Sequence, residues 1–295
     1  METALGRFVS ARRYAAGVGW VIGYIALWLA VEIGSALLGQ LAGHDLKALA
    51  PAVQGILEIA GVLALTWAFR TKGNKADLPS LGMVRPRWTW LIVGLIAGAL
   101  GILVVCGVEY TLGWLHPLAI QLGPRSGVPR ILFMLAVFIP SIGVGFTEEL
   151  AFRGYAFQTL AERGPIWVAA LVSTLLWAGL HFTLGGFGIS FVLSVTAMGI
   201  VFVILRLLSG SLWLPIGFHA AWDFTQTYVM GVATTGSGPH DPALLPVSQT
   251  GPALWVGSAP SIEGGMLYLI LMLLILAGLV IFMRASGRRL SRRAA

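Results

Sequence analysis

Apolar runs of about 20 residues recur along the whole chain, and this pattern constrains the fold more than any other feature. A helix of that length spans the hydrocarbon core of a bilayer. Within lipid a helix also satisfies its own backbone polar groups. The sequence therefore predicts an all-α polytopic membrane protein with about eight transmembrane helices, over 15–41, 50–69, 90–115, 131–161, 165–183, 188–208, 211–230 and 264–283.

Composition supports this reading. Of 295 residues, 57% are hydrophobic and 11% are charged, whereas about a quarter of a soluble domain is charged. The formal charge is +7, but the basic residues lie almost entirely between or beyond the apolar runs. Anionic lipids at the cytoplasmic face are therefore the expected partner, and nucleic acid is not. We expect a basic N-terminus over 1–14, one transmembrane domain over 15–283 and a basic tail over 284–295.

Basic residues also predict the orientation, because cytoplasmic loops retain Lys and Arg. With the N-terminus inside, 16 of the 19 basic residues lie on the cytoplasmic side. We therefore predict that both termini lie in the cytoplasm and that the membrane is a bacterial plasma membrane. The first apolar run is too long for a cleaved signal peptide, so we expect it to be retained as the first span. The segment 231–263 has no Lys or Arg and is expected outside, as a loop in which His240, Asp241 and Glu263 are solvated.

A charged side chain at the bilayer centre costs about 2.5 to 3.5 kcal/mol on insertion scales, so each one in a span needs a reason. Glu109 and Arg206 lie near span ends, and we expect them to reach the interface. Glu32 and Glu58 are isolated acids in the first two spans. We expect them to pair with polar groups or to be protonated, and their replacement to matter much less than that of the residues below.

The other ionisable residues form three short patterns. In the first, Glu149 and Arg153 are four residues apart and share a helix face, so they can pair. Glu148 points about 100° away from Glu149 and lacks a local counter-charge. A carboxyl group shielded from water and close to a like charge suits an acid that must accept and return a proton. A purely architectural ion pair explains Glu149 and Arg153 but not Glu148.

The second and third patterns place Trp177 beside His181 and His219 beside Asp223, again four residues apart. A lone histidine in a membrane is often only a hydrogen-bonding group between helices. A His and Asp on one face can also fix the imidazole's orientation. Helix rise puts Glu148 and His181 about 23 and 26 Å from the turn that joins their helices. Antiparallel helices therefore bring these residues to similar depths, which predicts one polar cluster.

These three motifs, in this order, resemble the CAAX protease and bacteriocin-processing family (CPBP, also called Abi) over about 131–230. The resemblance implies an intramembrane endopeptidase that hydrolyses membrane-associated proteins or peptides. It further implies that Glu148 with His181 activates water, that His219 with Asp223 stabilises the oxyanion, and that Glu149 and Arg153 hold the site in shape.

Two residues depart from the family pattern. Trp177 stands where the second motif usually begins with Phe, and Asp223 stands where the eukaryotic CAAX proteases have Asn. An anionic Asp is a poorer oxyanion donor than Asn unless it is protonated or orients His219. The family is commonly classed as metalloprotease, so zinc stays open as a cofactor, although the spacing is not His-Glu-x-x-His and a Glu/His pair can activate water without metal.

Two other functions remain open. A catalytically silent member of the family would act as an immunity or scaffold protein in the membrane. A proton-coupled transporter would use Glu32, Glu58, Glu148 and the histidines as a relay. The absence of a visible internal repeat argues against the transporter, because two related halves are common in that class.

Overall fold

The computed structural model describes residues 4–42, 50–83, 85, 87–118, 130–185, 188–235, 243–257 and 262–287. The α-helices in this part of the chain are α1 (Ala4–Ala42), α2 (Ala50–Trp67), α3 (Trp88–Thr111), α4 (Arg130–Glu148), α5 (Phe157–Ala161), α6 (Ile166–Gly185), α7 (Ile189–Ser209), α8 (Trp213–Phe224), α9 (Ala253–Val256) and α10 (Met266–Ala285). Short π-helical segments extend three of them: η1 (Ala68–Gly73), η3 (Glu149–Ala156) and η4 (Thr225–Val229). The remaining elements are the 3₁₀ turns η2 (Pro79–Leu81) and η5 (Ile262–Gly264) and the strands β1 (Leu115–Pro117) and β2 (Val247–Gln249).

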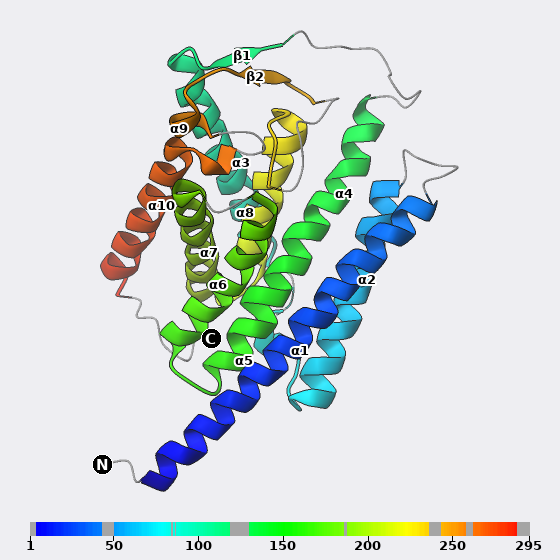
Figure 1. Ribbon diagram of the computed structural model, residues 1–295, viewed down its shortest axis with the longest axis vertical. Coiled ribbons are helices and arrows are strands. Elements are labelled where there is room, and N and C mark those ends of the chain that lie inside the picture. Colours follow the sequence, from blue (N-terminus) through cyan, green and yellow to red (C-terminus); the bar gives the residue numbers. More distant parts are fainter. Residues whose placement is uncertain are drawn as a thin grey trace.

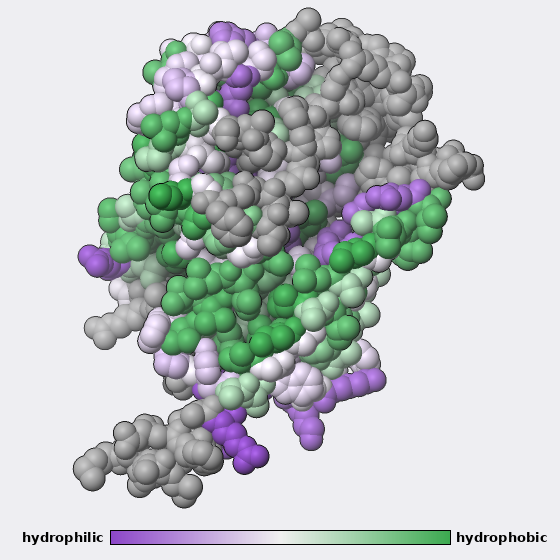
Figure 2. All heavy atoms as spheres, viewed as in Figure 1, coloured by the Kyte–Doolittle hydropathy of each residue, from purple (hydrophilic) through white to green (hydrophobic). Residues whose placement is uncertain are grey.

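The chain is a mostly helical integral membrane protein, and a helix lies in each of the eight predicted segments. Apolar side chains form a broad area across the middle of the face shown in Figure 2, with hydrophilic side chains gathered at its lower end. By length and composition, the described helices that suit a membrane span are Arg12–Leu41, Ala52–Gly73, Trp88–Thr111, Ile189–Ser209 and Met266–Ala285.

Helices α1 and α2 pack together along one side of the bundle, and α2 also packs against α4 (Figure 1). Helix α8 lies in the interior, where it contacts α3, α4 and α7. Glycines allow α3 and α8 to touch backbone to backbone: a Cβ at Gly98 would lie 2.1 Å from the carbonyl oxygen of Phe218, and one at Gly217 would lie 2.4 Å from that of Leu91. Such small-residue contacts are typical of helix pairs in membranes, and here they fix the helix that carries His219.

The fourth predicted span is one helical run from α4 through η3 to α5, and Pro140 lies inside α4. The run changes to π-helical geometry at Glu149, the second residue of the acidic motif. Single-turn π segments inside α-helices occur frequently at functional sites. Every residue of η3 is buried, so this turn faces the protein interior.

The structure differs from the prediction at the end of α3 and in the segment 231–263. Helix α3 stops at Thr111 rather than at 115, because Gly113 adopts a positive φ of 71° and the chain turns into β1. The segment 231–263 is not a plain loop, since its described part contains β2, α9 and η5. Strand β2 pairs antiparallel with β1, with Leu115 opposite Gln249.

Glu109 and Arg206 do not reach an interface as predicted, because both are buried. The side chain of Glu109 is 0% exposed, and its Oε2 accepts a 2.7 Å hydrogen bond from Nε2 of Gln249 on β2. Arg206 is 2% exposed, and a Cβ at Gly82 would come within 2.6 Å of its guanidinium carbon. In both cases a segment distant in sequence folds over the end of the helix.

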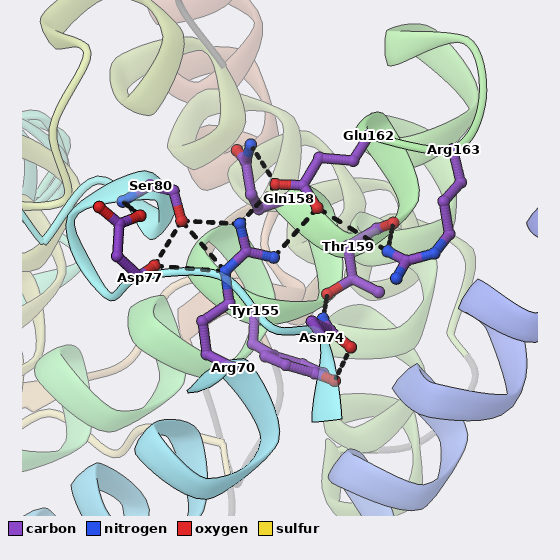
Figure 3. A network of polar contacts seen from close by, with 9 residues as sticks. All are labelled: Arg70, Asn74, Asp77, Ser80, Tyr155, Gln158, Thr159, Glu162 and Arg163. Atoms are coloured by element: carbon purple, nitrogen blue, oxygen red, sulfur yellow. Dashed lines mark hydrogen bonds and ion pairs between the residues drawn. The ribbon is translucent and has the colours of Figure 1, made fainter. Parts of the chain in front are cut away.

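A polar network connects Arg70 and the residues after α2 with side chains near the end of α5 (Figure 3). Arg70 is 1% exposed; its guanidinium pairs with the Glu162 carboxylate and donates to Oγ of Ser80 at 2.6 Å. Burial alone would raise the pKa of Glu162, but the hydrogen bonds and charge of Arg70, helped by Gln158, hold it below its ordinary value. The network joins the segment after α2 to the end of α5.

Candidate active site

Helix α4, the π-helical turn η3, and helices α6 and α8 carry the predicted site residues. Five of the six are linked by contacts, and the sixth lines the same cavity. Among the five, neighbouring groups lie between 2.9 and 3.9 Å apart. The six residues are Glu148, Glu149, Arg153, His181, His219 and Asp223.

Glu149 and Arg153 form the predicted ion pair. Nη1 of Arg153 lies 2.9 Å from Oε1 of Glu149, and both side chains are 0% exposed. Arg153 also donates through Nη2 to the carbonyl oxygen of Gly199 at 3.2 Å. The same Oε1 of Glu149 lies 3.2 Å from Nδ1 of His219. The pair therefore holds the imidazole of α8 as well as its own turn.

Aromatic rings enclose this ion pair. The Arg153 guanidinium lies over the rings of Trp177 and Phe202, at 4.6 and 4.7 Å from their centroids. The imidazole of His219 stacks on Phe202 with centroids 4.7 Å apart. Cations are attracted to the faces of such rings. Phe202 was missed by the sequence analysis, because a phenylalanine in an apolar helix carries no signal beyond packing.

Glu148 has a partner that the sequence did not predict. The indole Nε1 of Trp177 donates a 2.6 Å hydrogen bond to its Oε2. The Nε2 atom of His219 lies 3.9 Å from the same oxygen. The Glu148 side chain is 17% exposed, and Oε1 is the oxygen that remains to face a water molecule. The contact depends on the indole, since a phenylalanine in place of Trp177 has no N–H to donate.

His219 also meets the residue predicted to orient it. Its Nε2 lies 3.4 Å from Oδ2 of Asp223, which is 28% exposed, while His219 itself is 4% exposed. Both imidazole nitrogens thus face carboxylates, which can only accept hydrogen bonds when ionised. The arrangement suits an imidazole that carries a proton on each nitrogen and donates from both.

His181 is placed by Trp177, one helical turn earlier. Its Nδ1 lies 3.1 Å from the carbonyl oxygen of Trp177, and the two rings are 4.2 Å apart. A nitrogen that faces a carbonyl acts as donor, so the other nitrogen of a neutral imidazole is left as acceptor. That nitrogen is available to the cavity.

A cavity of about 770 Å³ joins these groups and is lined by Glu148, His181, His219 and Asp223. Two further acids line it, against prediction. Glu263 is 8% exposed rather than solvated, and its Oε2 accepts hydrogen bonds from the main chain and hydroxyl of Thr235. Glu32 of α1 lines the same cavity. His240 and Asp241 lie outside the described residues.

Glu32 and Glu58 are not isolated either. Their carboxyl groups lie close enough to influence each other electrostatically, and Oε1 of Glu58 accepts a 2.7 Å hydrogen bond from Oγ1 of Thr147. Sequence could not reveal these contacts, because they depend on how α1, α2 and α4 are rotated about their axes.

The residues of the cluster do not fit a zinc ion. Among the described residues, no group of three or more His, Cys, Asp or Glu side chains could hold a metal. Glu149 is occupied by Arg153 and His219, and Oε2 of Glu148 by Trp177. We therefore derive no catalytic step through a metal.

The fold and the cluster together define a class: an integral membrane protein with ionisable groups around a shared cavity. Residues 130–225 match the family model described as type II CAAX prenyl endopeptidase Rce1-like. This match supports the assignment of residues 130–225 to the CAAX protease family and confirms the resemblance seen in the sequence. No curated protein matches the chain.

Proposed function

We propose that this protein is an intramembrane endopeptidase that hydrolyses peptide bonds of membrane-associated substrates with a Glu/His-activated water. The observation that carries the proposal is the shared cavity, into which α4, α6 and α8 bring a carboxyl group and two imidazoles. These are the groups that general acid–base hydrolysis requires.

Glu148 is the proposed base. Trp177 holds Oε2, so Oε1 accepts a proton from water while His181 orients that water through its free ring nitrogen. The water oxygen then bonds to the scissile carbonyl carbon, and the carbonyl oxygen takes up negative charge. Glu148 returns the proton to the leaving amine as the C–N bond breaks, so atoms and charge balance.

His219 is the proposed oxyanion stabiliser. Held at Nδ1 by Glu149 and flanked by Asp223, its ring presents Nε2 to the cavity. Donors fixed in place before the reaction stabilise an oxyanion most effectively. In this role Asp223 orients the imidazole and does not need to donate, which accommodates an Asp at this position.

The membrane arrangement belongs to the same proposal. We propose eight spans, both termini in the cytoplasm, and contact between the basic termini and anionic lipids. The proposal draws on the 16 basic residues that an N-in arrangement places on the cytoplasmic side. The proposed setting is a bacterial plasma membrane.

The test is proteolysis of a library of membrane-anchored peptides by the purified protein, read by mass spectrometry. The parent is expected to cleave a subset, and Glu148→Ala to cleave none above background. A silent immunity or scaffold protein would leave the library intact in both samples.

A proton-coupled transporter is the second candidate function, and one observation favours it. Glu32 shares the cavity with Glu148, and Glu58 lies close enough to Glu32 for their carboxyl groups to interact. A relay of this kind predicts proton flux into vesicles containing the purified protein, reduced by Glu32→Gln. The peptidase proposal predicts no flux.

A further inference from the structure

The hydrogen bond between α2 and α4 ends directly beside the proposed base. Thr147 precedes Glu148 in the chain, is 0% exposed, and donates from Oγ1 to Oε1 of Glu58 at 2.7 Å. Glu58 is 3% exposed. Neither residue lines the cavity, so neither is in a position to touch a substrate.

The two helices are also in close contact along the part of α4 that precedes this bond. A Cβ at Gly55 would lie 3.0 Å from Cα of Pro140, and one at Gly143 would lie 3.5 Å from Cδ1 of Ile59. Thr147 is one turn beyond Gly143, and the π-helical turn begins two residues later at Glu149. The bond therefore fixes α4 where its geometry changes.

A carboxyl group is a costly choice for packing alone. An apolar side chain at position 58 would insert into the membrane at lower cost, because a buried acid must be desolvated. Glu32 lies close enough to Glu58 for the two carboxyl groups to interact, and it lines the same cavity as Glu148.

We propose that Glu58 is a positioning residue for the hydrolysis, acting through the Thr147 hydroxyl to hold Glu148 in register with Trp177 and the cavity. The inference rests on the proposed function and extends it to a helix outside the three motifs. A base misplaced by about 1 Å loses roughly 100-fold in rate, so loss of this hydrogen bond lowers turnover without removing any group that touches substrate.

The test compares paired variants of the full-length protein in cleavage of a membrane-anchored peptide. Thr147→Val keeps the shape of the side chain and removes the hydrogen-bond donor, while Thr147→Ser keeps the donating hydroxyl. Glu58→Leu removes the acceptor oxygen, and Glu58→Gln keeps one. Thr147→Val and Glu58→Leu are expected to lower kcat about 10- to 100-fold with KM nearly unchanged. Thr147→Ser and Glu58→Gln are expected to stay close to the parent. The combination of Thr147→Val and Glu58→Leu should cost no more than either alone.

Thr66→Val is the matched control. Thr66 is also buried in α2, and its hydroxyl hydrogen-bonds Tyr24 of α1 at 2.7 Å, away from the cavity lining. It should lower the melting temperature and leave kcat of the folded protein unchanged. Equal effects of Thr66→Val and Thr147→Val on kcat would overturn the positioning role, as would parental kcat in both Thr147→Val and Glu58→Leu.

A second measurement keeps this inference separate from the peptidase proposal. Labelling of Glu148 by a hydrophobic carbodiimide, followed by peptide mass spectrometry, reports the placement of the carboxyl without any substrate. Thr147→Val and Glu58→Leu should both change its labelling rate, and Thr66→Val should not. An unchanged rate in the first two overturns the positioning role. If the parent cleaves no peptide but the labelling rate of Glu148 still changes in these two variants, the positioning role is supported and the peptidase proposal is refuted.

Discussion

Glu149→Ala tests how the site is held together. The substitution leaves the Arg153 guanidinium 0% exposed with no carboxylate partner, and within the described residues its one remaining hydrogen bond is to the carbonyl oxygen of Gly199. It also removes the acceptor of Nδ1 of His219. Removing one member of a buried ion pair costs about 3 to 5 kcal/mol, so Glu149→Ala should lower folded yield and melting temperature as well as activity.

The matched variant is Glu149→Leu combined with Arg153→Met, which removes both charges and keeps much of the volume. Replacement of a whole buried pair by apolar residues is often neutral or stabilising by about 1 to 4 kcal/mol. The double variant should therefore melt above Glu149→Ala in detergent, yet stay inactive. If Glu149→Ala and Arg153→Ala both express and melt like the parent, the ion pair does not support the fold and the reasoning is wrong.

Three further predictions concern pH, topology and the oxyanion. The pKa of Glu162 lies below its ordinary value of 4.5 in the folded protein. The stability that this carboxylate contributes is therefore present above pH 4.5 and is lost as the pH falls below that value. Arg70→Gln should flatten this pH dependence of the melting temperature. In a background lacking the native cysteine, a membrane-impermeant reagent applied outside should label Ser248→Cys and miss Ser286→Cys, and the reverse pattern would sink the proposed orientation. His219→Ala should raise the barrier by about 2.7 to 4 kcal/mol, the value of one oxyanion donor, and a parental single-turnover rate would refute the role.

The helices were predictable because apolar runs of membrane length leave the backbone no other way to satisfy its hydrogen bonds. Contacts within one helix were also predictable. Glu149 with Arg153 and His219 with Asp223 are four residues apart, and helical periodicity alone brings them together.

Contacts between helices were not predictable, because they depend on the rotation of each helix about its axis. The bonds from Trp177 to Glu148 and from Thr147 to Glu58 join residues 29 and 89 positions apart. The one signal in the sequence was the indole itself, which offers an N–H where an apolar ring would have sufficed for packing.

The burial of Glu109 and Glu263 was mispredicted for a related reason. Glu109 and Glu263 are covered by contacts with Gln249 and Thr235 from the segment 231–263, which was expected to be a plain external loop. Its strand is three residues long, too short to leave an alternating pattern in the sequence.

The most direct test of the central claim is single-turnover cleavage of a membrane-anchored peptide by Glu148→Gln. The variant keeps an acceptor oxygen for Trp177 and the size of the side chain but loses basicity, so it should fold and melt like the parent. Its rate should fall by roughly two to four powers of ten. Undiminished cleavage by well-folded Glu148→Gln would contradict the assignment of Glu148 as the base that activates water.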